Sequence, residues 1–159
     1  VQVLLMQRLG RPTVLHFVAY AGNVACLQAI LARYPESERY RAVNASTKAG
    51  QTPLHCAARL GHHECVRVLL SQSTESQHLQ AICKPDRNGR TPLHLAANSR
   101  FDNPEMVTVV LGPLPEAERF TVLNMQDRLG DTILQCATRA SNTKTMKAIL
   151  DLCPALMEK

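Results

Sequence analysis

The 159-residue sequence contains no tryptophan, and aromatic residues make up only 4% of it. A core must therefore be built from aliphatic side chains, cysteine and methionine, for which a hydrophobic content of 45% is sufficient. No apolar run approaches the about 18 residues that a membrane span requires, and no secretory signal opens the chain. We therefore exclude a membrane span and expect a cytoplasmic location.

The sequence also lacks the short motifs of common catalytic and metal sites. No Gly-rich phosphate loop, His-Glu-x-x-His or Gly-x-Ser-x-Gly pattern occurs, and the six cysteines form no Cys-x-x-Cys pair. His62, His63 and Cys65 lie close together but do not have the usual spacing of zinc ligands. We predict a non-enzymatic protein with no metal and no organic cofactor.

A tetrapeptide recurs at a regular spacing. Thr-Pro-Leu-His occupies residues 52–55 and returns 39 residues later at 91–94, and related tetrapeptides occupy 13–16 and 132–135. Small residues follow each copy, and then Val, Leu and Ile at helical spacing. Threonine before proline is typical of a helix start. The pattern predicts a stack of helix pairs in which each pair buries its apolar side against its neighbours.

The segment from Gly50 to His62 resembles the ankyrin repeat consensus at every fixed position, and Gly89 to Ala97 resembles its first two-thirds. The resemblance implies an all-α solenoid of about four helix-turn-helix units. It also implies a structural role for the histidine of the tetrapeptide, which in ankyrin repeats bonds to backbone groups. The units are approximately residues 9–46, 47–85, 86–126 and 127–159.

The period of 39 residues exceeds the about 33 residues of typical ankyrin repeats. The surplus lies in the connections, where Pro or Thr precedes acidic residues and two apolar residues follow three apart. These apolar pairs are Tyr40 and Val43, Leu79 and Ile82, and Phe120 and Leu123. We predict an extra short helix in each connection, packed across the convex side, with a plain loop as the alternative. Such insertions are similar to the elongated ankyrin repeats of large bacterial host-interacting proteins, whose location would be the host cytoplasm.

Two further features of the sequence leave alternatives open. The third unit is lengthened by two residues within 98–104, which is either a specific contact or neutral variation of a loop. The chain starts without methionine, and both ends (residues 1–6 and 150–157) are rich in apolar residues. We expect a segment of a longer protein that continues into further repeats or another domain.

Ankyrin repeats bind proteins through their β-turn tips and the exposed side of their first helices, which form a concave face. In the first unit the corresponding positions are Leu9, Pro12, Tyr20 and Ala21. Elsewhere we predict as partner-binding residues Lys48, Gln51, Arg59, Leu60, Arg87, Asn88, Arg90, Asn98, Ser99, Arg128, Leu129 and Arg139. Six of these are basic, and Asp131 is the one acid at such positions, whereas glutamates gather in the expected convex helices.

The first hypothesis is a protein-interaction module whose basic concave face binds an acidic or polar partner protein. The second is a structural spacer that positions a flanking domain of the parent chain or self-associates through apolar end residues such as Leu150 and Met157. Nucleic-acid binding is disfavoured, because the net charge is only +5 and aromatic stacking residues are missing from the basic side.

Overall fold

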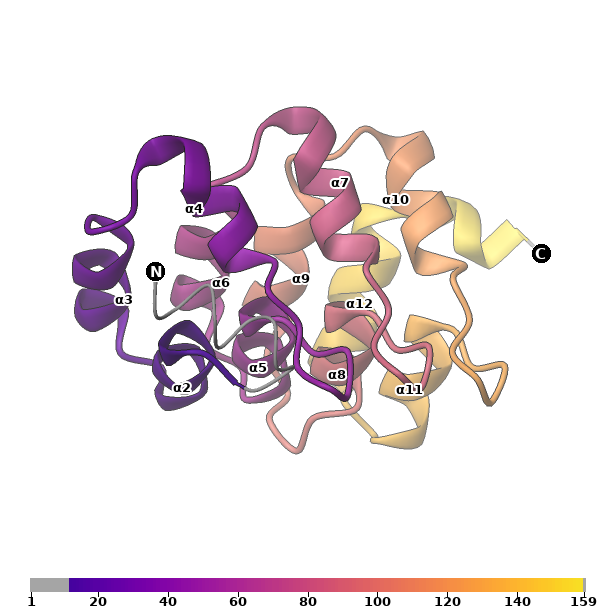
Figure 1. Ribbon diagram of the computed structural model, residues 1–159. Helices are drawn as coiled ribbons and strands as arrows, with labels where there is room; N and C mark the ends of the chain where they lie inside the picture. The colour runs from indigo at the N-terminus through magenta and orange to yellow at the C-terminus, as the bar shows by residue number, and fades with distance from the viewer. Residues whose placement is uncertain (1–11, 159) are drawn as a thin grey trace.

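The computed structural model describes residues 12–158, and in this range the chain forms helices, turns and connections without a strand. Groups of three helices succeed one another, and the last group ends in a short 3-10 helix (Figure 1). The elements are α2 (Val14–Ala21), α3 (Val24–Leu31), α4 (Glu36–Val43), α5 (Pro53–Arg59), α6 (His63–Leu70), α7 (Glu75–Cys83), α8 (Pro92–Ala97), α9 (Pro104–Leu111), α10 (Glu116–Leu123), α11 (Ile133–Arg139), α12 (Thr143–Leu152) and η1 (Pro154–Glu158). The all-α fold predicted from the sequence is confirmed.

Helices in equivalent places of successive groups pack side by side. The first helices α2, α5, α8 and α11 contact one another in chain order, as do the second helices α3, α6, α9 and α12. Figure 1 shows these two rows, with the third helices α4, α7 and α10 along the upper edge. Each group thus buries its apolar side against its neighbours, as a solenoid requires.

A threonine caps the start of every first helix. In α5, the backbone N–H of His55 donates to Thr52 Oγ1, and the backbone N–H of Thr52 donates to His55 Nδ1 at 3.1 Å. Pro53 follows at the first helical position, where the missing N–H would have had no helical partner. The same reciprocal cap is present at α2, α8 and α11. The sequence signal and the local structure therefore agree.

The histidine of each tetrapeptide joins its unit to the next one. Because Nδ1 accepts the threonine N–H, the ring proton lies on Nε2, which donates to a backbone carbonyl of the following turn. The Nε2 to oxygen distances are 2.9 Å from His16 to Gln51, 3.2 Å from His55 to Arg90 and 3.0 Å from His94 to Asp131. Burial lowers the pKa of all three histidines, that of His55 to about 4. Their role in the described structure is to connect units.

The extra helix predicted for the connections is present in all three connections that the structure describes, as α4, α7 and α10. Val43, Ile82 and Leu123 are buried, and the apolar residues three positions before them are half-buried. These helices therefore add apolar residues to the core along one edge of the solenoid.

An arginine of α10 ties that helix to the ends of two others. Arg119 donates from Nε to the carbonyl of Leu111 at 3.0 Å and from Nη2 to that of Gly112 at 2.8 Å. Its Nη1 reaches the carbonyl of Leu152 at 3.3 Å. A cation is favourable at a helix C-terminus, where backbone carbonyls lack helical partners. Arg119 thus holds the C-terminal ends of α9 and α12 beside α10.

The longer loop of the third unit makes structural contacts with the fourth. Asp102 accepts hydrogen bonds from the backbone N–H groups of Lys144 and Thr145, both at 2.9 Å, and from the Thr145 hydroxyl at 2.8 Å. Asn142 donates from its side chain to the carbonyls of Ala97 and Ser99. The inserted loop therefore contacts the start of α12 within the chain, and the two alternatives that the sequence left open for it stay predictions.

The cysteines differ in exposure although several hold equivalent positions. Cys65 is buried, whereas Cys26 at the equivalent position of α3 is exposed. In the row of second helices, α3 packs against α6 and has no described second helix on its other side. All six cysteines are free. Burial raises the pKa of Cys56, Cys65, Cys83, Cys136 and Cys153.

Some expectations concern residues outside the described range. Leu9 and the apolar segment 1–6 fall before residue 12, where the description begins. At the other end, Leu150 and Leu156 are half-buried and Met157 is exposed. Among the described residues, no helix is long and apolar enough to cross a membrane.

Candidate functional site

The predicted partner-binding residues lie mainly on one surface, which we term the inner face. It comprises the turns at residues 47–51, 86–90 and 127–131 together with the exposed residues of α2, α5 and α11 and Asn98 at the end of α8, a helix that is itself buried. Adjacent turns are joined by backbone hydrogen bonds, from Arg87 N to Ala49 O at 2.8 Å and from Arg128 N to Asn88 O at 3.0 Å. The turns are therefore held in register along the solenoid.

Close packing of the turns requires glycine. Gly50 has a φ of +77°, and a Cβ atom built on it would lie 3.0 Å from the backbone nitrogen of Arg87. Gly89 has a φ of +73° and stands in the same relation to Arg128. Only glycine adopts the left-handed backbone at little cost, and only glycine lacks the Cβ atom that would crowd the neighbouring turn. These glycines set the spacing at which Lys48, Arg87 and Arg128 are presented.

The exposure of the predicted residues divides them into three groups. Leu129 is 80% exposed, and the other exposed members are Lys48, Arg59, Arg87, Asn88, Asn98, Arg128 and Arg139. Gln51, Leu60 and Arg90 are half-buried. Ser99 is only 8% exposed, and its Oγ accepts a hydrogen bond from the backbone of Phe101. Ser99 is thus part of the loop between α8 and α9 and is not presented to a partner.

Two of the six cations are already neutralised by carboxylates. Arg90 lies 3.3 Å from Asp86, and Arg139 forms an ion pair with Asp131. Lys48, Arg59, Arg87 and Arg128 make no ion pair with any residue of the described range. These four, contributed by three units, are the cations available to an incoming acidic group; we call them the free cations.

The acids at the bases of the turns have a structural task that the sequence pattern did not reveal to us. Asp86 Oδ1 accepts hydrogen bonds from the backbone N–H groups of Asn88 at 2.9 Å and Arg90 at 3.0 Å. Asp127 makes the equivalent bonds to the next turn. The signal that predicts them is aspartate three residues before glycine, which is typical of a side-chain-closed turn. They rigidify the turns, and they lower the net positive charge of the inner face.

The inner face is hollowed at its N-terminal end, between α2, α5 and the turn at 47–51. The hollow has a volume of about 600 Å³ and is lined mainly by apolar groups, those of Phe17, Tyr20, Pro12, Ala49 and Cys56 among them. Phe17 is 64% and Tyr20 59% exposed. Sequence reasoning placed Tyr20 at a contact position but missed Phe17, because the equivalent residues Cys56, Leu95 and Cys136 fit a core position. The signal available in the sequence was the aromatic ring of Phe17, which is larger than the Cys or Leu that the other units have at this position.

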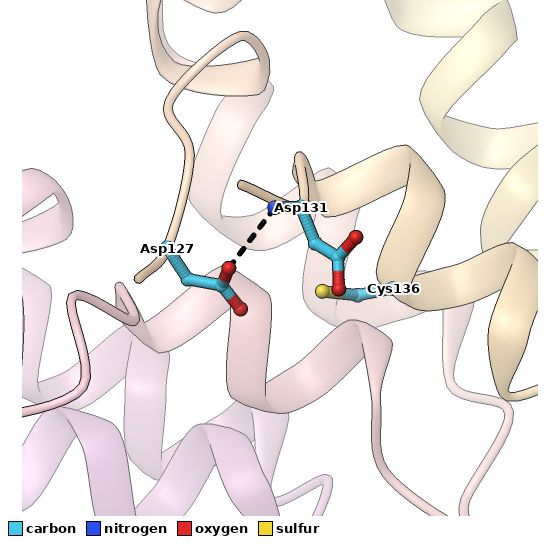
Figure 2. Close-up of side chains that lie close together, drawn as sticks. All are labelled: Asp127, Asp131 and Cys136. Carbon is cyan, nitrogen blue, oxygen red and sulfur yellow. Dashed lines mark hydrogen bonds between the residues drawn. The ribbon is translucent and has the colours of Figure 1, made fainter. Parts of the chain in front are cut away.

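A second cluster lies at the other end of the inner face, where Asp127, Asp131 and Cys136 bring potential metal ligands within 4.8 Å of one another (Figure 2). Asp127 Oδ1 already accepts from the backbone N–H of Asp131 at 3.0 Å, the dashed line of Figure 2. Asp131 is held by Arg139, whose Nη2 donates to Oδ1 at 3.1 Å. Burial, followed by the two carboxylates, raises the pKa of Cys136 to about 11. A neutral thiol and committed carboxylates are a poor donor set for a metal ion.

Two family models match the chain, one of ankyrin repeats in 3 copies over residues 1–78 and one of ankyrin repeats in many copies over residues 54–111. The chain belongs to the ankyrin-repeat family. No curated protein matches it.

The ankyrin geometry continues beyond the matched residues. In the fourth unit Thr132 caps α11, and Gln135 replaces the histidine: its Oε1 accepts the backbone N–H of Thr132 at 2.8 Å. The side-chain amide thus takes over the capping half of the histidine's role. The resemblance seen in the sequence therefore extends structurally through α12.

Membership in the family defines the broad class of activity. Ankyrin repeats are generally non-enzymatic modules for protein–protein interaction. The inner face corresponds to the turn tips and first helices that were expected to form the contact surface.

Proposed function

We propose that this ankyrin array binds a partner protein through the inner face, and that the partner presents an acidic segment to the free cations Lys48, Arg59, Arg87 and Arg128. The observation that carries the proposal is that these four side chains, from three consecutive units, share one face without a carboxylate partner in the described range. An arginine without an ion pair can bind a carboxylate through two parallel hydrogen bonds.

The distribution of acidic residues supports the same face. Glu36, Glu38 and Glu116 are exposed on the third helices α4 and α10, away from the turns that carry the cations. An acidic partner would be attracted toward the free cations of the inner face, whereas on α4 arginines such as the exposed Arg41 offset the glutamates, so the third helices offer no comparable excess of positive charge.

The experiment is an affinity capture from cell lysate, read by mass spectrometry, with the wild-type chain and the variant R59E/R87E/R128E. We expect a prey protein that the wild type retains and the variant loses, because each reversal replaces an attraction by a repulsion. The purified prey should bind the variant at least tenfold more weakly, which corresponds to about 1.4 kcal/mol.

The matched control is R33E/R41E/K147E, which changes the net charge equally at exposed cations outside the inner face. It should retain the prey, and circular dichroism should show the same helix content for all three chains. If the inner-face variant recovers the same prey as the wild type, the proposed face is wrong. The spacer hypothesis, in which end residues such as Leu150 and Met157 matter more, then becomes the better account.

A further inference from the structure

Exposed large apolar side chains are concentrated on a single helix. Val14, Phe17 and Tyr20 all lie on α2, and they account for half of the exposed large hydrophobic residues of the described range. Phe17 and Tyr20 are three positions apart and therefore share one side of the helix. Both line the hollow of about 600 Å³ that the turn at 47–51 closes from the other side. A clustered apolar surface of this kind is typical of an interaction site.

We propose that this hollow is an anchoring pocket for one aromatic or large aliphatic side chain of an extended acidic peptide segment, whose carboxylate lies about three residues from the anchor and pairs with Arg59. The inference rests on the proposed function, because it assigns a specificity pocket to the same inner face. It commits to a partner segment that combines one apolar anchor with nearby acidic residues.

The lining of the hollow is mainly apolar, and two of its polar groups are already engaged within the chain. Both ring nitrogens of His16 are engaged, Nδ1 with the backbone N–H of Thr13 and Nε2 with the carbonyl of Gln51. The backbone N–H of Gln51 donates to Thr47 Oγ1 at 3.3 Å. His16 and the backbone N–H of Gln51 therefore offer no hydrogen bond to a polar ligand, whereas an apolar side chain would bury its surface against the rings of Phe17 and Tyr20.

The charges next to the hollow define the rest of the partner. Lys48 lies in the lining and is exposed, and it has no ion pair with a described residue. Arg59, also a free cation, holds in α5 the position that Tyr20 holds in α2, 39 residues earlier. An apolar anchor flanked by carboxylates matches this arrangement, and a basic peptide does not.

The spacing between anchor and carboxylate follows from helix packing. α2 and α5 are neighbours in the row of first helices, and packed helices lie about 8–10 Å apart. A peptide in the extended polyproline II conformation advances about 3.1 Å per residue and brings every third side chain to the same side. A segment that runs along the inner face therefore needs about three residues to pass from the level of Tyr20 to that of Arg59.

The test is a selection of randomised dodecapeptides displayed on phage against three forms of the full chain. These are the wild type, the variant F17S/Y20S, and the control F101S, which removes an exposed aromatic residue outside the hollow. We expect the wild type and F101S to enrich peptides with an aromatic or large aliphatic residue about three positions from Asp or Glu. The F17S/Y20S variant should still enrich acidic peptides but without the apolar residue.

The affinity of a selected peptide, made synthetically, gives the quantitative readout. Alanine at the anchor should weaken its binding to the wild type at least tenfold and should leave binding to F17S/Y20S unchanged. An equal loss on both chains would overturn the pocket.

The remaining outcomes separate the pocket from the proposed function. Enrichment of acidic peptides without an apolar preference overturns the pocket and leaves the basic face standing. Enrichment without acidic residues, or none at all, overturns both. Binding of single-stranded oligothymidine to the wild type that is lost in F17S/Y20S would also overturn the pocket, because it would show that Phe17 and Tyr20 stack on bases.

Discussion

At the scale of single residues, the histidines of the repeated tetrapeptide couple local capping to the joining of units. Each accepts a backbone N–H at Nδ1 and donates from Nε2 to the next unit. Protonation would place a second N–H against the threonine N–H that Nδ1 now accepts. The neutral ring is therefore the form that the fold requires. Burial disfavours the charged ring as well and lowers the pKa of His55 to about 4.

The lowered histidine pKa values predict destabilisation by mild acid. Between pH 6.5 and about 4 the unfolded state binds more protons than the folded state, so the free energy of unfolding falls as pH falls through this window. For His55 alone, the free energy of unfolding at pH 5 should be about 2 kcal/mol lower than at pH 7. Urea denaturation at pH 7 and pH 5, followed by circular dichroism, measures it.

Glutamine offers a matched control for this effect. Gln135 shows that a side-chain amide forms the same cap to Thr132. The variant H16Q/H55Q/H94Q should therefore lose most of the difference between pH 7 and pH 5, while it keeps its helix content at pH 7. A variant as sensitive to acid as the wild type would show that the histidines are not the cause.

At the scale of elements, the loop between α8 and α9 acts as the N-terminal cap of a distant helix. Asp102 satisfies two backbone N–H groups of the first turn of α12, and its negative charge is favourable at a helix N-terminus. Burial alone would raise the pKa of this carboxyl, but the hydrogen bonds from Lys144 and Thr145 hold the pKa below its ordinary value of 3.8. This stabilisation is present above pH 3.8 and is lost as pH falls through the lowered pKa.

Removal of this cap should loosen α12. We expect D102A to lower the free energy of unfolding by about 1–2 kcal/mol, the usual effect of losing a capping side chain. Hydrogen exchange should show faster exchange at the amides of Lys144 and Thr145. The control D151A removes an exposed carboxylate of the same helix and should leave both unchanged. Unaltered exchange in D102A would mean that the loop does not stabilise α12.

At the scale of the whole molecule, four cations without a carboxylate partner share the inner face, whereas the third helices carry both signs of charge. The free cations occupy the inner face, while Glu36, Glu38 and Glu116 are exposed on the third helices. The total net charge of +5 is modest, so its arrangement matters more than its size for association with a partner.

Association with an acidic partner should depend on salt. The screening length is about 10 Å at 0.1 M salt and about 3 Å at 1 M, so the association rate should fall as salt is added. R59E/R87E/R128E should show a weaker or reversed dependence, and R33E/R41E/K147E should behave as the wild type does. Surface plasmon resonance with the captured prey measures the rates. A rate independent of salt would count against electrostatic steering.

Much of the fold could be predicted from the sequence because its signals are local. The threonine caps, the small residues after them and the apolar pairs such as Tyr40 and Val43 each act within about one helical turn. The repetition of these signals then requires stacking, since no unit can bury its apolar side alone. The helix pairs and the extra helices follow from these signals.

Contacts between units were decided only by the tertiary structure. The burial of Ser99 and the exposure of Cys26 depend on which side chains the stack brings together, or leaves uncovered. The hollow beside Phe17 is of the same kind, because its walls come from two first helices and a turn far apart in the sequence. The ion pairs of Arg90 with Asp86 and of Arg139 with Asp131 form within single units. The sequence by itself thus determined the repeating unit, through short-range capping and periodicity. The tertiary structure determined the rest: the path of the chain within a unit pairs Arg90 and Arg139 with carboxylates, and the distances between stacked units leave the apolar surface beside Phe17 open.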